Sequence, residues 1–138
     1  MIGVILITHG ALGKELLISA ERILGTQEHV RVISVEPGDG LETIRERLSA
    51  IIKSGEFPKE IIMLVDIFGG TPSNASLSFA VNPGVEILSG VNLPMLIALF
   101  TERENTSLSE LTLKIEGLGK KGIISIKQKL QERLENKK

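Results

Sequence analysis

The stretch Ile61 to Val65 is an unbroken apolar run in which no polar residue alternates with the apolar ones. A strand with one face in water alternates apolar and polar side chains, so an uninterrupted run is typical of a strand covered on both faces. Such strands occur mainly in parallel sheets that carry helices on both sides. This run therefore predicts an α/β domain, and it constrains the fold more than any other stretch of the chain.

The rest of the chain alternates between patterns of strands and of helices. Short apolar or β-branched runs predict strands at Ile2–Ile7, Val30–Val35, Ile61–Val65 and Val85–Leu88. Apolar residues three and four apart predict helices over 12–24, 41–52, 71 to about 80, about 94–101, 108–118 and 126–134. This alternation favours one doubly wound, mainly parallel α/β sheet flanked by helices, in a single domain over residues 1–138. We expect the flavodoxin-like strand order 2-1-3-4.

Local signals predict where several helices begin. Asp39 has the position of a capping residue, and Thr71 is the expected N-cap of a helix whose first residue is Pro72. Near the carboxyl terminus, Ile123 to Ser125 are expected to form a fifth, very short strand. Ser125 then caps a last helix with a charged end.

The composition argues against several classes of function. The 16 basic and 17 acidic residues nearly cancel and there is no Trp or Tyr, so nucleic acid would find neither a basic surface nor stacking platforms. Cys is absent, which removes disulfides, thiolate metal sites and cysteine nucleophiles and fits a reducing compartment. The first apolar run is too short to span a bilayer. We expect a cytoplasmic protein without membrane insertion, metal or other cofactor.

Polar residues follow two strands that we expect to be neighbours. His9 comes just after the first apolar run, and Asp66 directly follows the third. Ligands of open parallel sheets bind beyond the carboxyl ends of the strands, where the strand order reverses, so the expected order brings both residues to that edge. A carboxylate that accepts Nδ1–H of a histidine leaves Nε2 as a nucleophile. Either residue alone is more often structural, but the pair favours chemistry.

The stretch Gly69-Gly70-Thr71-Pro72 begins the helix after Asp66. Two adjacent glycines alone are typical of a tight turn. Beside His9, however, a helix start with free N–H groups and the Thr71 hydroxyl would suit a phosphoryl oxygen. Neither Gly-x-Gly-x-x-Gly after the first strand nor Gly-x-x-x-x-Gly-Lys-Ser/Thr occurs, which argues against dinucleotide and P-loop sites.

Three motifs lie at this edge: Ile5-Leu6-Ile7-Thr8-His9-Gly10, Val65-Asp66-Ile67-Phe68-Gly69-Gly70-Thr71-Pro72-Ser73-Asn74 and Gly90-Val91-Asn92-Leu93-Pro94-Met95. In this order they resemble the IIA components of mannose-type sugar phosphotransferase systems, the mannose/fructose/sorbose family, over nearly the whole chain. Where many relatives carry Trp, this chain has Phe68. We expect that difference to leave the chemistry intact and to alter docking of the next carrier.

The resemblance implies a phosphoryl carrier of sugar uptake. The phosphocarrier HPr would phosphorylate His9 on Nε2, Asp66 would orient the ring, and the group would pass to a IIB component that serves the membrane subunits IIC and IID. The candidates for phosphate contact are Thr71, Gly70, Ser73, Asn74, Thr8 and Gly10. The resemblance also implies a homodimer that exchanges a short strand, for which Gly122 to Ile126 is the candidate.

Two other functions remain open at the level of the sequence. The phosphoryl-carrier domain that serves dihydroxyacetone kinase has the same fold and an N-terminal histidine, although its loop after the third strand differs from Gly69-Gly70-Thr71-Pro72. A regulatory module could instead hold an anion at the His9 edge without transferring it. Phosphate transfer to a IIB protein distinguishes the carrier from such a module.

Overall fold

The computed structural model describes residues 1–137, and its sheet contains four parallel strands in the order β2-β1-β3-β4. The strands are β1 (Gly3–His9), β2 (Val30–Val35), β3 (Ile61–Val65) and β4 (Val85–Leu88). The helices are α1 (Leu12–Leu24), α2 (Leu41–Lys53), α3 (Thr71–Leu77), α4 (Leu93–Glu102), α5 (Leu108–Lys121) and α6 (Ile126–Asn136). The expected fold class and strand order are confirmed.

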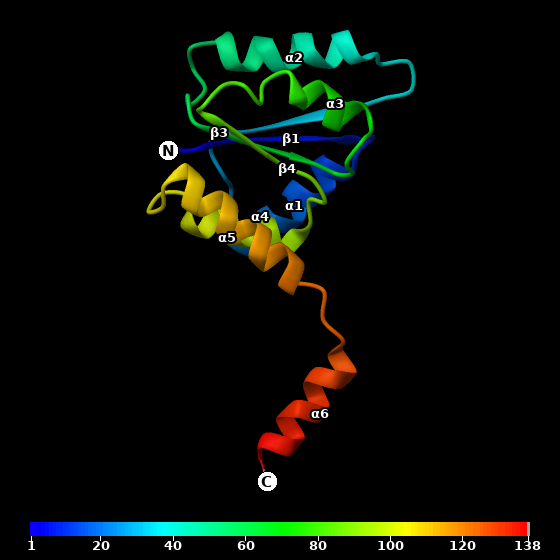
Figure 1. The fold of residues 1–138 in the computed structure, drawn as a ribbon, viewed down its shortest axis with the longest axis vertical. Coiled ribbons are helices and arrows are strands. Elements are labelled where there is room, and N and C mark those ends of the chain that lie inside the picture. Colours follow the sequence, from blue (N-terminus) through cyan, green and yellow to red (C-terminus); the bar gives the residue numbers. More distant parts are fainter. Residues whose placement is uncertain (138) are drawn as a thin grey trace.

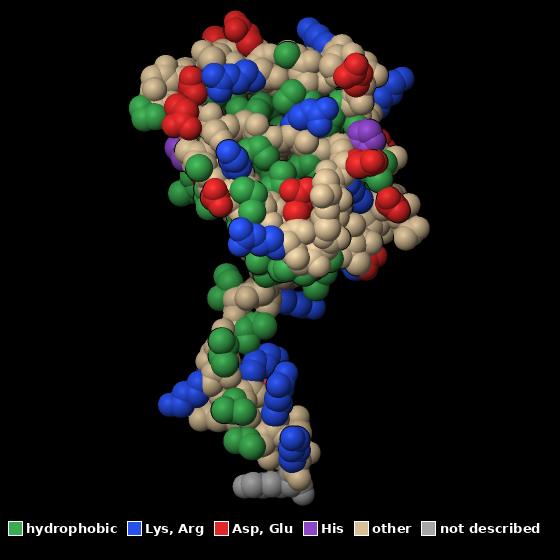
Figure 2. Space-filling model, turned by 180° about the vertical axis from the view of Figure 1, so that it is seen from behind, with side chains coloured by type: hydrophobic (Ala, Val, Ile, Leu, Met, Phe, Trp, Pro, Cys, Tyr) green, Lys and Arg blue, Asp and Glu red, His purple; other side chains and the backbone are tan. Residues whose placement is uncertain are grey.

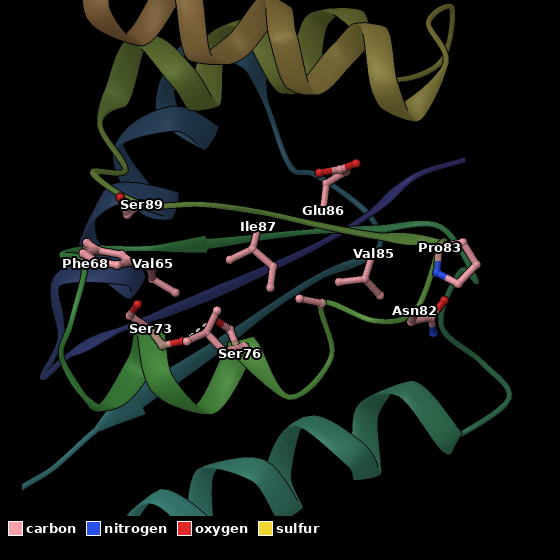
Figure 3. Close-up of a pocket in the computed structure, with 12 residues that line it drawn as sticks. Val65, Phe68, Ser73, Ser76, Asn82, Pro83, Val85, Glu86, Ile87 and Ser89 are labelled. Carbon is pink, nitrogen blue, oxygen red and sulfur yellow. Dashed lines mark hydrogen bonds between the residues drawn. The ribbon is translucent and has the colours of Figure 1, made fainter.

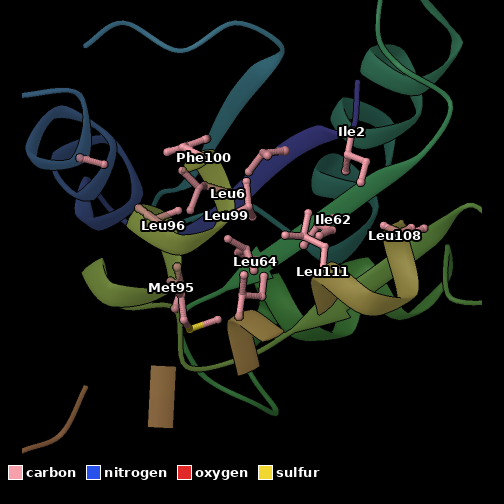
Figure 4. Close-up of a cluster of buried hydrophobic side chains, with 14 residues drawn as sticks. Ile2, Leu6, Ile62, Leu64, Met95, Leu96, Leu99, Phe100, Leu108 and Leu111 are labelled. Carbon is pink, nitrogen blue, oxygen red and sulfur yellow. The ribbon is translucent and has the colours of Figure 1, made fainter. Parts of the chain in front are cut away.

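Helices cover both faces of the sheet. α2 and α3 lie on one face, and α1, α4 and α5 lie on the other (Figure 1). Every residue of β3 is buried, and His9 is the only exposed residue of β1. On the α4 and α5 face, Leu6 and Leu64 pack with Leu96 and Leu111 (Figure 4). The central strands are therefore buried on both sides, as their apolar runs indicated, and only the last residue of β1 emerges.

Two helix starts differ from the expectation. The N-cap of α2 is Gly40, because the Asp39 carboxylate instead accepts a hydrogen bond from the backbone N–H of Glu36 at 2.9 Å. The N-cap of α3 is Gly70 and no side chain caps it, so the prediction for Thr71 is wrong by one residue. α3 also ends at Leu77, earlier than expected. The turn before α2 and the glycines before α3 thus decide where these helices begin.

The carboxyl-terminal arm, residues 122–137, stands apart from the rest of the chain (Figure 1). Residues 123–125 form no strand here, contrary to the expectation, since no neighbouring backbone lies alongside them. Ser125 caps α6 as expected, accepting from the backbone N–H of Gln128 at 3.3 Å. α6 has no buried residue. Apolar side chains gather along α6 and along the segment before it, residues 122–125 (Figure 2).

Candidate active site

His9 occupies the carboxyl end of β1, held there by its neighbours on both sides. Its backbone still pairs with Val35 of β2, so the strand runs two residues beyond the predicted end. Thr8 is fully buried, and its hydroxyl accepts from the backbone N–H of Gly13 at 2.7 Å. Gly10 takes a left-handed φ of +54°, which a glycine adopts without steric cost, and turns the chain toward α1. The backbone of His9 is therefore fixed while its side chain projects outward.

Asp66 lies next to His9 because β1 and β3 are adjacent in the sheet. Its Oδ2 accepts from the backbone N–H of His9 and lies 2.9 Å from His9 Nδ1. Its Oδ1 accepts from the backbone N–H of Ile67 at 3.0 Å. Burial raises the pKa of the Asp66 carboxyl, but the hydrogen bonds and charge of His9, with the Ile67 N–H, outweigh burial and lower it below 3.8. Asp66 is thus a carboxylate at neutral pH.

An ionised carboxylate only accepts hydrogen bonds, so His9 Nδ1 carries the proton that points at Asp66. The neutral ring then has its lone pair on Nε2, the atom on the far side of the ring. The Asp66 side chain is 11% exposed, whereas that of His9 is 54% exposed. The predicted pairing is present, and it leaves an oriented nucleophilic nitrogen open to a second molecule.

The loop before α3 approaches the same ring. Gly69 has a φ of +94°, and Gly70 follows in an extended conformation, φ −89° and ψ −180°. A β-carbon on Gly70 would lie 3.3 Å from His9 Nε2, so this backbone passes close to the reactive atom. Thr71, the next residue, lines a hollow of about 590 Å³ together with His9 and Gly10.

The remaining candidates for phosphate contact lie elsewhere. The Thr8 hydroxyl is engaged with α1, as described above. Ser73 is 5% exposed and lines a second hollow, about 400 Å³, between α3 and β4 (Figure 3). Asn74 is exposed, and its backbone N–H bonds to Gly70 O at 2.9 Å. The structure therefore places Thr71, Gly70 and Gly10 beside the ring, and turns the side chains of Thr8 and Ser73 away from it.

The sequence reasoning missed the loop after β2, residues 36–39, which lines the His9 hollow together with Val35 at the end of that strand. Its Glu36 and Asp39 add two carboxylates there. A signal was available, because β2 was expected beside β1 and its turn residues follow at the same edge. Among the described residues that line the hollow, none carries a positively charged side chain.

An apolar rim adjoins the site. Ile67 is 59% exposed and Phe68 is 77% exposed, directly after Asp66. Phe68 lies at one end of the hollow between α3 and β4, near Ser73 and Val65 (Figure 3). Large apolar side chains left in water beside a reactive group suit contact with another protein.

Two further observations bear on the class of site. Among residues 1–137, no group of three His, Cys, Asp or Glu side chains is placed to hold a metal ion. In the same part of the chain, no helix is long and apolar enough to cross a membrane.

The fold and the site define a doubly wound α/β protein with an exposed, carboxylate-oriented histidine at its switch point. The model of the family described as "PTS system fructose IIA component" matches residues 3–116. The "PTS system fructose-specific EIIA component" of Bacillus subtilis is 34% identical over 119 residues, which are 86% of this chain and 82% of that protein. The chain belongs to this EIIA family.

Other relatives agree. The "PTS system mannose-specific EIIAB component" of Escherichia coli K12 is 34% identical over 134 residues, 96% of this chain, and the chain spans 42% of the length of that relative. The solved structure of "phosphotransferase system component EIIA from Streptococcus agalactiae" is 32% identical, with a TM-score of 0.84 over 93% of this chain and 99% of that one. Similarity to these EIIA proteins therefore extends over nearly the whole chain.

Proposed function

We propose that this single-domain protein is a cytoplasmic phosphoryl carrier, which accepts phosphate from HPr on His9 and passes it to a IIB component. The route would serve uptake of a sugar of the mannose/fructose/sorbose class, the sugars that the names of its relatives give, and the membrane subunits would be IIC and IID. The observation that carries the proposal is the His9 Nδ1 to Asp66 Oδ2 contact of 2.9 Å, with the ring otherwise open. That geometry supports a phosphotransferase with a phosphohistidine intermediate.

The proposed step is an in-line displacement at phosphorus. The Nε2 lone pair of His9 forms the new N–P bond while the bond from phosphorus to the donor nitrogen breaks. The Nδ1 proton stays on the ring, and Asp66 balances the positive charge that the phosphorylated imidazole gains. Transfer to IIB reverses these roles. No metal or other cofactor takes part in this mechanism.

We propose that the incoming phosphoryl group contacts Thr71, Gly70 and Gly10, which lie beside the ring. Ser73 would act through its backbone N–H in the first turn of α3, and Thr8 through the backbone position of His9. Asn74, on the exposed side of α3, is a further candidate for a polar contact with the phosphoryl group. The apolar rim of Ile67 and Phe68 would receive the partner proteins, because the nearly neutral chain offers little long-range steering.

The test is labelling of the wild type and of His9→Ala with enzyme I, HPr and labelled phosphoenolpyruvate. The wild type should gain acid-labile phosphate and pass it to a IIB protein, and the variant should stay unlabelled. Acid-labile label that persists on the variant would place the phosphoryl group elsewhere. Label that never leaves for IIB would favour the anion-binding module, and transfer only to a dihydroxyacetone kinase would favour the other carrier.

We further propose a homodimer that exchanges residues 122–126. Ile123 and Ile126 are 86% and 83% exposed, and beyond Gly122, which approaches Pro94 of α4, the arm extends away from the sheet and its helices (Figure 1). A second copy would cover these side chains and could supply the strand that is absent from the single chain. Sedimentation at micromolar concentration should give the mass of a dimer, and a monomer would refute the exchange.

A further inference from the structure

Two adjacent glycines precede α3, and they are required for different reasons. Gly69 has a φ of +94°, and a β-carbon there would meet no atom within 4 Å. Gly70 has an ordinary extended backbone, but a β-carbon there would lie 2.9 Å from His9 Cε1 and 3.3 Å from Nε2. Gly69 therefore serves the turn, whereas Gly70 leaves space beside the imidazole.

We propose that Gly70 is a positioning residue for phosphoryl transfer: its missing side chain keeps the Nε2 side of His9 open while the ring stays on Asp66. This inference rests on the proposed carrier function and assigns a further residue to it. The role does not depend on backbone conformation, since any residue adopts the φ and ψ of Gly70.

Neither the His9 ring nor the loop that carries Gly70 is free to move away from the other. Carbon atoms pack best at about 3.5–4.0 Å, so a β-carbon 2.9 Å from Cε1 would press on the ring. The ring is held by the 2.9 Å contact between Nδ1 and Asp66, and moving away would lengthen it. The carbonyl of Gly70 accepts from the backbone N–H of Asn74 in the first turn of α3, which holds the loop. A methyl group at position 70 would therefore disturb the orientation of His9.

The transfer step adds a second demand on the same space. As the N–P bond forms at Nε2 and the donor bond breaks, the three phosphoryl oxygens need room around that nitrogen. A β-carbon 3.3 Å from Nε2 would occupy part of the volume next to it. The β-carbon would therefore hinder the chemical step as well as partner docking. We expect phosphoryl transfer from a small donor to be slowed as well as transfer from a protein donor.

Gly70→Ala tests the inference, and Gly40→Ala is a matched control. Gly40 is also an N-cap, with φ −92° and ψ 170°, and a β-carbon there would meet nothing within 4 Å. Single-turnover labelling would be measured with phospho-HPr and with phosphoramidate, a donor without a protein surface. We expect Gly70→Ala to be slowed about 100-fold with both donors, as for a misplaced reactive group, and Gly40→Ala to match the wild type.

Nitrogen-15 NMR of His9 supplies a readout that a purely structural role would not move. The Nδ1 and Nε2 shifts should change in Gly70→Ala and stay constant in Gly40→Ala, while circular dichroism shows both variants folded. Labelling of Gly70→Ala within twofold of wild type would overturn the inference. Slowing of Gly70→Ala with phospho-HPr but not with phosphoramidate would also overturn it, because Gly70 would then be a docking residue. Loss of the fold in Gly70→Ala would overturn it as well, because the role of Gly70 would then be structural. A wild type that neither donor labels would instead refute the proposed function.

Discussion

Replacing Asp66 by Asn tests how far the carboxylate acts by charge. Asp66 accepts three hydrogen bonds: from the backbone N–H and Nδ1 of His9 at Oδ2, and from the N–H of Ile67 at Oδ1. An amide offers one oxygen and one NH₂ group. Placing the oxygen at the Oδ2 position keeps two of the three bonds and sets the NH₂ against Ile67. We therefore expect the Nδ1–H tautomer of His9 to survive in the variant.

The size of the effect follows from the type of bond that is lost. Hydrogen bonds to charged groups contribute about 1.5–3 kcal/mol, and those between neutral groups about 0.5–1.5 kcal/mol. The variant should therefore stabilise the imidazolium of the transition state less well by about 1–2 kcal/mol. At about 1.4 kcal/mol per factor of ten, transfer should slow by about 5- to 30-fold.

Rapid-quench labelling from phospho-HPr measures this rate, and NMR reports the tautomer. A rate within twofold of wild type would show that Asp66 is only structural. Slowing beyond about 1000-fold, with the proton moved to Nε2, would show that the amide turns its NH₂ toward His9. Either result would refute the reasoning from the three hydrogen bonds.

Three further predictions concern stability and docking. The pKa of Asp66 lies below its usual 3.8, so its stabilising effect is present above that value and is lost as the pH falls through the lowered pKa. In urea, the wild type should exceed Asp66→Asn in stability at pH 6, and the gap should close in acid. Phe68→Ala should slow transfer to IIB about tenfold but leave phosphoramidate labelling unchanged, and equal slowing would contradict docking. Leu96→Ala, at a fully buried position, should cost about 2–5 kcal/mol of unfolding free energy, against about 0.5 or less for the exposed Leu77→Ala.

The paired site could be predicted because it depends on the most strongly determined part of the sequence. Two unbroken apolar runs specify strands that are covered on both faces, and such strands take the central positions of a parallel sheet. Once β1 and β3 are neighbours, His9 and Asp66 follow them to the same edge. The 2.9 Å contact and the hydrogen bond from the backbone N–H of His9 depend on side-chain and backbone conformations that the pattern of apolar runs does not contain.

Helix starts were less predictable because the competing choices differ little in energy. Asp39 and Thr71 are good capping residues by type, yet a favoured cap contributes only about 1 kcal/mol. The carboxylate of Asp39 instead accepts from Glu36 within its own turn, and Gly70 precedes α3 where the chain passes His9. These are tertiary constraints, which a local pattern does not contain.

The sequence also could not distinguish the roles of the two glycines before α3, because Gly70 is needed where the backbone passes close to His9. The dipeptide Gly69-Gly70 indicates a turn, and a turn explains only the first glycine, with its φ of +94°. The reason for the second lies on β1, far away in sequence. Likewise, residues 123–125 have the composition of a strand, but a strand forms only where another backbone pairs with it.

In the proposed carrier function the protein must release the group that it accepts, so we expect the His9 hollow to hold phosphate weakly. Glu36 and Asp39 line it, and there is no Lys or Arg among the described lining residues. Arg47 of α2, which is not part of the lining, lies 3.5 Å from the Asp39 carboxylate and pairs with it. Neutral hydroxyl and N–H donors near Thr71 hold an anion less tightly than charged ones would. We therefore expect a phosphoryl group on His9 to depend mainly on its bond to Nε2, with the charge of Asp66 stabilising the ring rather than the phosphate. Under the proposed function, this separation would let the protein activate His9 for acceptance without trapping the product of that step.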